Sequence, residues 1–207
     1  MDEKTAVRER ILAAALQRFK HYGYAKTTMA EIASDCAMSA ANIYRFFESK
    51  IDLAEAMARQ HHAEQHGRLA AIARRVQLSA EERLRELLFA RMRENFALFE
   101  ANAKILEIAA VLHQERPLHA NEELALERVY LKQILADGIA TGVFAARENL
   151  EHVAEMIQSA TVKFSFPQLF SQLTLPKLER ELAGVLDLII DGLRAQPART
   201  PERANVS

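Results

Sequence analysis

The chain has 207 residues, half of them apolar and 27% charged, which is the composition of a globular protein with a sizeable core. No apolar run approaches the roughly 20 residues needed to cross a bilayer, and a single cysteine, Cys36, excludes an internal disulfide and a multi-cysteine metal site. The first ten residues are charged and lack the apolar stretch of a secretory signal, so we expect a cytoplasmic protein with no membrane partner. The net charge of −1 does not favour nucleic acid, but residues 1–50 hold eight basic and six acidic residues.

The whole chain has the pattern of α-helices. It contains only six glycines and five prolines, and no strand-like alternation bounded by turn residues. We therefore predict an all-α protein of about nine helices, the first ending before Gly23. The predicted helices span about 6–21, 28–35, 40–47, 50–75, 80–100, 104–114, 121–137, 150–165 and 176–193.

Residues 23–50 (GYAKTTMAEIASDCAMSAANIYRFFESK) predict two short helices joined by a tight turn at 36–38. Thr28 can cap the first helix, and Glu31 three residues later completes a capping box. Ser39 can cap the second. This is the helix-turn-helix arrangement, in which the second helix enters the DNA major groove.

Over about residues 5–57, specific residue types stand at fixed distances from one another along the chain. They are Ile11, Leu12, Ala14, Ala15, Phe19, Gly23, Tyr24, Thr27, Thr28, Met29, Glu31, Ile32, Ala33, Ser39, Ile43, Tyr44, Phe47, Lys50 and Leu53. On these residues the chain resembles the DNA-binding domain of the TetR family of bacterial transcriptional regulators. It departs from the family pattern at Ala41, where glycine is usual, and at Arg45-Phe46, where an aromatic-histidine pair is usual.

The resemblance implies three segments. Residues 1–49 would form a three-helix helix-turn-helix head, and residues 50–194 a helical domain for ligand binding and dimerisation. The polar residues 195–207, which contain two prolines, are expected to be a disordered tail.

The outer side of the second hairpin helix is the predicted DNA face. Asn42 suits adenine, Arg45 suits guanine or a phosphate, and Ala40 suits a thymine methyl group. By chemistry and by the family's habit, other side chains would contact phosphates. The predicted DNA-binding residues are Thr28, Ser39, Ala40, Asn42, Tyr44, Arg45 and Lys50.

The last two predicted helices are apolar over broad arcs. The resemblance implies that two copies pair them in a four-helix bundle, giving a homodimer that reads palindromic operator DNA. Burial of these arcs within one chain is the alternative. The predicted dimer residues are Met156, Phe164, Leu182, Leu186, Ile189, Ile190 and Leu193.

The resemblance also implies a small-molecule effector cavity among the middle helices, for a mostly apolar ligand with one or two hydrogen-bonding groups. Each candidate residue is alternatively an ordinary core residue. The candidates are Met92, Phe96, Phe99, Ile108, Leu112, His113, Tyr130, Ile134 and Ser159. Because repression is the commoner behaviour in the family, we expect a repressor that the ligand releases from DNA.

Histidine spacing suggests two weak metal candidates. His62 and His66 could share a helix face, but two ligands from one helix make half a site at best, and His113, Glu115 and His119 form only a loose cluster near the end of the sixth helix. We expect no metal and no cofactor. No HExxH, phosphate-binding glycine loop or nucleophile elbow occurs, so we expect no enzyme.

One other function is compatible with the sequence. The protein would then be a helical small-molecule-binding or interaction protein, without specific DNA recognition, in which the hairpin is only structural. A structural hairpin has no use for Asn42, Tyr44, Arg45 and Lys50 together, so we favour the DNA-binding regulator.

Overall fold

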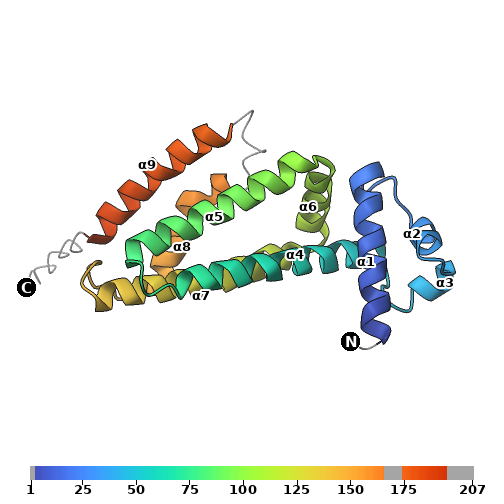
Figure 1. The fold of residues 1–207 in the computed structure, drawn as a ribbon, viewed down its shortest axis with the longest axis horizontal. Coiled ribbons are helices and arrows are strands. Elements are labelled where there is room, and N and C mark those ends of the chain that lie inside the picture. The colour runs from blue at the N-terminus through green and yellow to red at the C-terminus, as the bar shows by residue number, and fades with distance from the viewer. Residues whose placement is uncertain (1–2, 166–173, 195–207) are drawn as a thin grey trace, which may run out of the picture. The chain divides into compact units, whose positions relative to one another are not determined.

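The computed structural model describes residues 3–165 and 174–194, which form nine α-helices, one short 3-10 helix and no strand (Figure 1). The prediction of an all-α protein is confirmed. The elements are α1 (Glu3–Tyr22), α2 (Met29–Asp35), α3 (Ala40–Ile43), α4 (Lys50–Ala73), α5 (Ala80–Ala101), α6 (Lys104–Glu115), α7 (Pro117–Ala140), α8 (Leu150–Thr161), η1 (Val162–Phe164) and α9 (Leu175–Arg194). No helix in these ranges is both long and apolar enough to cross a membrane.

Local capping signals place most helix starts where the sequence predicts them. Thr28 and Glu31 form the complete capping box of α2, and Ser39 accepts a hydrogen bond from the Asn42 amide at the start of α3. Asn149 caps α8 in the same way through the His152 amide. These bonds satisfy amides that have no partner inside the helix, so the cap fixes the first residue.

Three helices differ from their predicted bounds by four residues at one end: α3, α7 and α8, the last of which ends at Thr161 and is followed by η1. α7 starts at Pro117, four residues earlier than predicted, because proline fits the first position of a helix, where no amide donor is needed. α3 has only one turn and ends at Ile43, since the next amides bond three residues back in tighter turns. The predicted tail at 195–207 lies outside the described residues.

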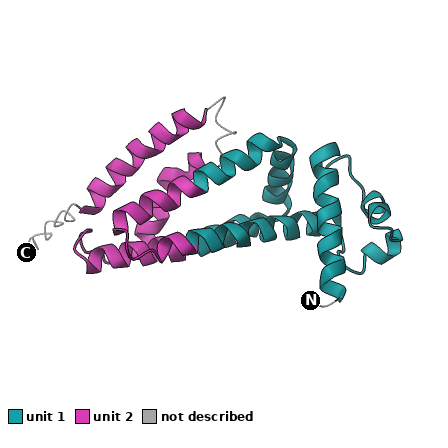
Figure 2. Ribbon diagram, viewed as in Figure 1, with its two compact units in different colours: residues 1–69, 91–127 teal, residues 70–90, 128–207 magenta. Residues whose placement is uncertain are grey.

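The chain divides into two compact units (Figure 2). The first comprises residues 1–69 and 91–127, and the second comprises residues 70–90 and 128–207. Helices α4, α5 and α7 contribute to both, so the units do not follow the predicted boundary at residue 50.

The core of the first unit explains this division. Ile11, Phe19, Ile32 and Ile43 from the three-helix head are fully buried. Apolar side chains of α4 and α6 complete the same cluster. They are Ile51, Leu53, Ala54, Ile108 and Leu112. The head is therefore a three-helix core closed by α4 and α6, and α6 is separated from it by more than 50 residues of chain.

The second unit is built on the apolar face of α9, which packs against α8. Leu178, Leu182, Leu186 and Ile190 repeat at helical spacing and are fully buried. A side chain at Gly138 would collide with the ring of Phe144, which is buried beside it after the end of α7.

Candidate nucleic-acid interface

The hairpin of α2 and α3 is held by its own polar groups. The Glu31 amide donates to Thr28 Oγ1 at 3.3 Å, and the Thr28 amide donates to Glu31 Oε2 at 2.8 Å. In the connecting turn Ala37 has a φ of 52°, a left-handed backbone conformation that residues other than glycine rarely adopt. Cys36 is buried at this turn, and burial raises the pKa of its thiol.

Helix α3 and the turn after it present two different sides. Ile43 and Phe47 are buried in the head core. Ser39, Ala40, Tyr44 and Arg45 are exposed and Asn42 is half-buried. We call these last five residues the α3 face. It carries a hydroxyl, a methyl, an amide, a phenol and a guanidinium, which are the group types that contact DNA bases and phosphates.

Arg8 supports this face and was missed by sequence reasoning. Its Nη1 donates to the Phe46 carbonyl at 3.1 Å, and its guanidinium carbon lies 4.1 Å from the centre of the Phe47 ring. The contact spans 38 residues, so no local spacing signals it.

Lys50 points toward the turn before α2 and is not part of the α3 face. Its Nζ donates to the Tyr24 carbonyl at 2.8 Å and to the Thr27 carbonyl at 2.9 Å, and it lies 4.3 Å from the centre of the Tyr24 ring. Two of its three donors thus hold the turn before α2. Lys50 therefore positions the hairpin, and its predicted phosphate contact stays a prediction.

Family comparisons agree with this geometry. A family model described as "Bacterial regulatory proteins, tetR family" matches residues 11–57, and "Tetracyclin repressor-like, C-terminal domain" matches residues 80–186, which is more than half of the chain. The chain belongs to the TetR family. It is a DNA-binding transcriptional regulator with the all-α fold of that family. None of the curated proteins compared with the chain matches it.

Solved TetR-family structures share the fold. A TetR/AcrR-family regulator from Thermobifida fusca has 22% identity and a TM-score of 0.65, covering 91% of this chain and 98% of its own. A putative TetR-family regulator from Mesorhizobium loti has 13% identity and a TM-score of 0.71, covering 93% and 98%. FadR from Bacillus subtilis, solved in complex with stearoyl-CoA, has 20% identity and a TM-score of 0.65, covering 89% and 98%. At these identities the comparison supports the fold alone.

In this TetR-family chain, α6 holds the head through its side chains. Glu107 accepts hydrogen bonds from the Tyr24 amide at 3.2 Å and the Ala25 amide at 2.7 Å. Asn102, just before α6, donates to the Lys20 carbonyl at 3.0 Å. A side chain at Gly23, whose φ is +90°, would meet the Glu107 carboxylate at 2.8 Å. The positive φ therefore favours glycine at this contact, and any larger residue would also have to displace the Glu107 carboxylate that binds the two amides.

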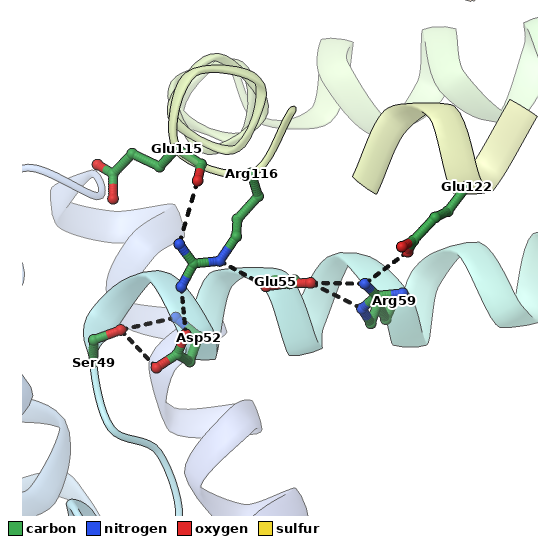
Figure 3. A network of polar contacts seen from close by, with 7 residues as sticks. All are labelled: Ser49, Asp52, Glu55, Arg59, Glu115, Arg116 and Glu122. Carbon is green, nitrogen blue, oxygen red and sulfur yellow. Dashed lines mark hydrogen bonds and ion pairs between the residues drawn. The ribbon is translucent and has the colours of Figure 1, made fainter. Parts of the chain in front are cut away.

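A second set of contacts joins the first turns of α4 to the junction of α6 and α7 (Figure 3). Arg116 donates to Asp52 at 2.7 Å and to Glu55 at 3.1 Å. Glu55 also binds Arg59 at 2.8 Å, and Arg59 reaches Glu122 of α7 at 2.9 Å. We call this set the Arg116 network. It fixes the helix that follows the head against two helices that follow much later in the chain.

The Arg116 network makes the first unit sensitive to acid. A hydrogen bond from Ser49 and the Arg116 guanidinium lower the pKa of Asp52, and Arg59 and Arg116 lower the pKa of Glu55. Both carboxylates bind protons more weakly when folded, so their stabilising contribution is present above their ordinary pKa of about 4 and is lost as the pH falls through the lowered values. Arg116→Gln should therefore lower the free energy of unfolding at pH 7, and the deficit should shrink at acidic pH. Urea titrations at both pH values test this; a constant deficit would contradict it.

Most of the predicted dimer residues are buried within their own chain. Leu182, Leu186 and Ile190 are fully buried, and Phe164 and Leu193 are 3% and 5% exposed. Side chains that are buried within one chain cannot contact a second chain directly. For these five residues the alternative of burial within one chain therefore holds. The apolar face of α9 is thus buried within the chain. Of the remaining predicted residues, Met156 is exposed and Ile189 is half-buried.

The predicted effector residues have different environments. In the first unit Met92 and Phe99 are buried and Phe96 is half-buried, but Ile108 and Leu112 belong to the head core and His113 is exposed. In the second unit Ile134 is buried, Tyr130 is half-buried and Ser159 is exposed. His113 and Ser159 are exposed to solvent, so neither lines an enclosed effector cavity in this chain.

One hollow in the first unit has a different character from the predicted cavity. It has a volume of about 350 Å³, four of its six lining residues are charged, and none of the predicted effector residues lines it. It is lined by Arg8, Leu12, Asp52, Glu55, Ala56 and Arg59.

Proposed function

We propose that the protein is a homodimeric repressor whose two α3 faces bind successive major grooves of a palindromic operator. The single observation that supports this most is the α3 face itself, where five groups suited to DNA lie on the outer side of α3 and its flanking residues, while Ile43 and Phe47 on the inner side are buried. A head of this size reads only a few base pairs, so a two-fold pair is needed for tight and specific binding. The role requires no catalysis, and we propose that it is carried out in the cytoplasm.

The exposed side of α8 and α9 is the proposed dimer surface. Leu188 is 76% exposed and Met156 is 49% exposed, both large apolar side chains. Gly184 and Gly192 lie four residues before and after Leu188, and a side chain at either would meet nothing within 4 Å. Glycines flanking a leucine let a second helix approach closely. This surface replaces the buried residues of the original prediction.

An effector would act through the helices that hold the head. We propose a mostly apolar ligand, since one structural relative was solved with stearoyl-CoA and another is described as a ketosteroid regulator. The ligand would bind one state of the protein preferentially and shift the contacts of α6 and the Arg116 network with the head. A shift of a few ångströms in the spacing of two heads prevents both from docking at once.

Titration of labelled duplex DNA from upstream of the protein's own gene, followed by fluorescence anisotropy, tests the proposal. We expect tight binding that prefers this duplex to a scrambled one and weakens steeply with salt, because basic groups displace counterions from phosphates. Equal, weak binding to both duplexes, together with weak binding to a genomic library of fragments, would favour the ligand-binding protein without DNA recognition.

A further inference from the structure

Two pairs of potential metal ligands face each other in the first unit. His62 and His66 are four residues apart on α4, and His119 and Glu123 are four residues apart on α7. Residues at this spacing lie on one face of a helix, so each pair presents two donor atoms in the same direction. We call these four residues the His62 cluster.

The distances bring the two pairs together. One donor atom each from His62, His119 and Glu123 lie within 4.8 Å of one another. His62 Nδ1 is 3.4 Å from Glu123 Oε2, and His66 Nε2 is 2.8 Å from the same oxygen. Four ligands at about 2.1 Å around one ion lie roughly 3.4 Å apart, so small side-chain rotations would complete the geometry.

The cluster contains buried nitrogens without protein partners. His119 is 6% exposed, and within the described part of the chain neither of its ring nitrogens has a hydrogen-bond partner. The Nδ1 atom of His62 is likewise buried without a hydrogen bond among these residues. The His62 and His119 rings stack at 5.3 Å with an angle of 19° between them. A buried ring nitrogen without a hydrogen bond costs free energy, and a bound ion would remove this cost at one nitrogen of each ring.

The surrounding contacts already set the spacing of the two helices. Arg59 of α4, three residues before His62, forms an ion pair with Glu122 of α7, beside Glu123. In the same Arg116 network, Arg116 itself, one residue before α7, pairs with Asp52 and Glu55 of α4. The donor atoms therefore lie on two helices that are fixed relative to each other within one unit, which is the preorganisation that a metal site requires.

We propose that His62, His119 and Glu123, with His66 as a fourth candidate ligand, bind one divalent transition-metal ion of the Zn²⁺ class. Imidazole nitrogens suit zinc, cobalt, nickel and copper, whereas Mg²⁺ and Ca²⁺ require mainly oxygen ligands. Three imidazoles and one carboxylate match the composition of tetrahedral zinc sites. The proposal departs from the expectation of no metal, which rested on His62 and His66 supplying at most half a site from one helix.

The test uses the full-length protein without a histidine tag, stripped with EDTA and exchanged into chelator-free buffer. We expect Zn²⁺ titration calorimetry to give one ion per chain, Co²⁺ to produce the visible absorption of a four-coordinate site, and Zn²⁺ to raise the melting temperature. Mg²⁺ at the same concentrations should do none of these. Absence of stoichiometric Zn²⁺ and Co²⁺ binding would overturn the proposal.

Variants locate the site. His119→Gln and Glu123→Gln should each weaken Zn²⁺ binding by about tenfold or more, since even outer-shell changes cost about 10- to 100-fold in affinity. His113→Gln, an exposed histidine on α6, is the matched control and should bind like the unmodified protein. Circular dichroism of the metal-free variants checks that each folds. If the His119→Gln protein does not fold, His62→Gln takes its place. Undiminished binding in folded Glu123→Gln and His62→Gln proteins would place the ion elsewhere and refute the site.

Discussion

Replacing Tyr44 and Arg45 with alanine together should weaken operator binding by about 100-fold or more and leave the melting temperature nearly unchanged. Tyr44 is 51% exposed and Arg45 is exposed, so their removal opens no cavity in the head. A good side-chain pair with a base contributes about 1–3 kcal/mol, and every 1.4 kcal/mol is tenfold in affinity. In a dimer the double substitution removes the contacts from both heads.

The matched control is a second pair in the same unit. Tyr22 is also 51% exposed, at the end of α1 outside the hairpin, and Arg93 is an exposed residue of α5. Tyr22→Ala with Arg93→Ala should retain operator binding. Anisotropy with operator and scrambled DNA measures both variants, and thermal melts verify folding. If the Tyr44 and Arg45 variant binds like the unmodified protein, the α3 face does not contact DNA.

Leu188→Glu should yield a folded monomer with at least about 100-fold weaker operator binding. Leu188 is the most exposed large apolar residue of α9, so a charge there costs the single chain little. In a dimer contact the same charge would be buried without a partner, which costs several kcal/mol. Operator affinity would fall as well, because two linked heads bind far more tightly than either head alone.

Leu186→Glu distinguishes the two sides of α9. Leu186 is fully buried in the chain, so this charge should unfold the second unit rather than produce a folded monomer. Size-exclusion chromatography with light scattering gives the mass, and circular dichroism gives the folded fraction. A Leu188→Glu protein that remains a dimer would exclude the exposed side of α9 from the contact.

Some of the structure follows from local sequence. The Thr28–Glu31 box, the Ser39 cap and the Asn149 cap are interactions between residues three apart, so each was predictable from a few letters. The outward position of Tyr44 and Arg45 followed equally from helical spacing once Ile43 and Phe47 were assigned to the core. The TetR-family membership was predictable for the same reason, since the family pattern lies mostly in this hairpin.

Partners that are distant in the chain could not be predicted in this way. Nothing in the spacing of Glu107 signals that it accepts bonds from Tyr24 and Ala25, more than 80 residues earlier. Lys50 is predicted from the sequence as a DNA-binding residue, and nothing in its spacing signals that the fold places two carbonyls around its ammonium group.

The sequence by itself determined the all-α class, the helix starts that have a side-chain cap and the α2–α3 hairpin, because these depend on caps and periodicities within about four residues. Only the tertiary structure decided that α6 completes the head core, that Leu186 is buried while Leu188 is exposed, and that His62 meets His119 and Glu123. Helical periodicity gives the residues that share a face, but the packing of one helix on another decides what covers that face. Which face is covered depends on side chains tens of residues away along the chain. This packing determines both the proposed dimer surface and the proposed metal site.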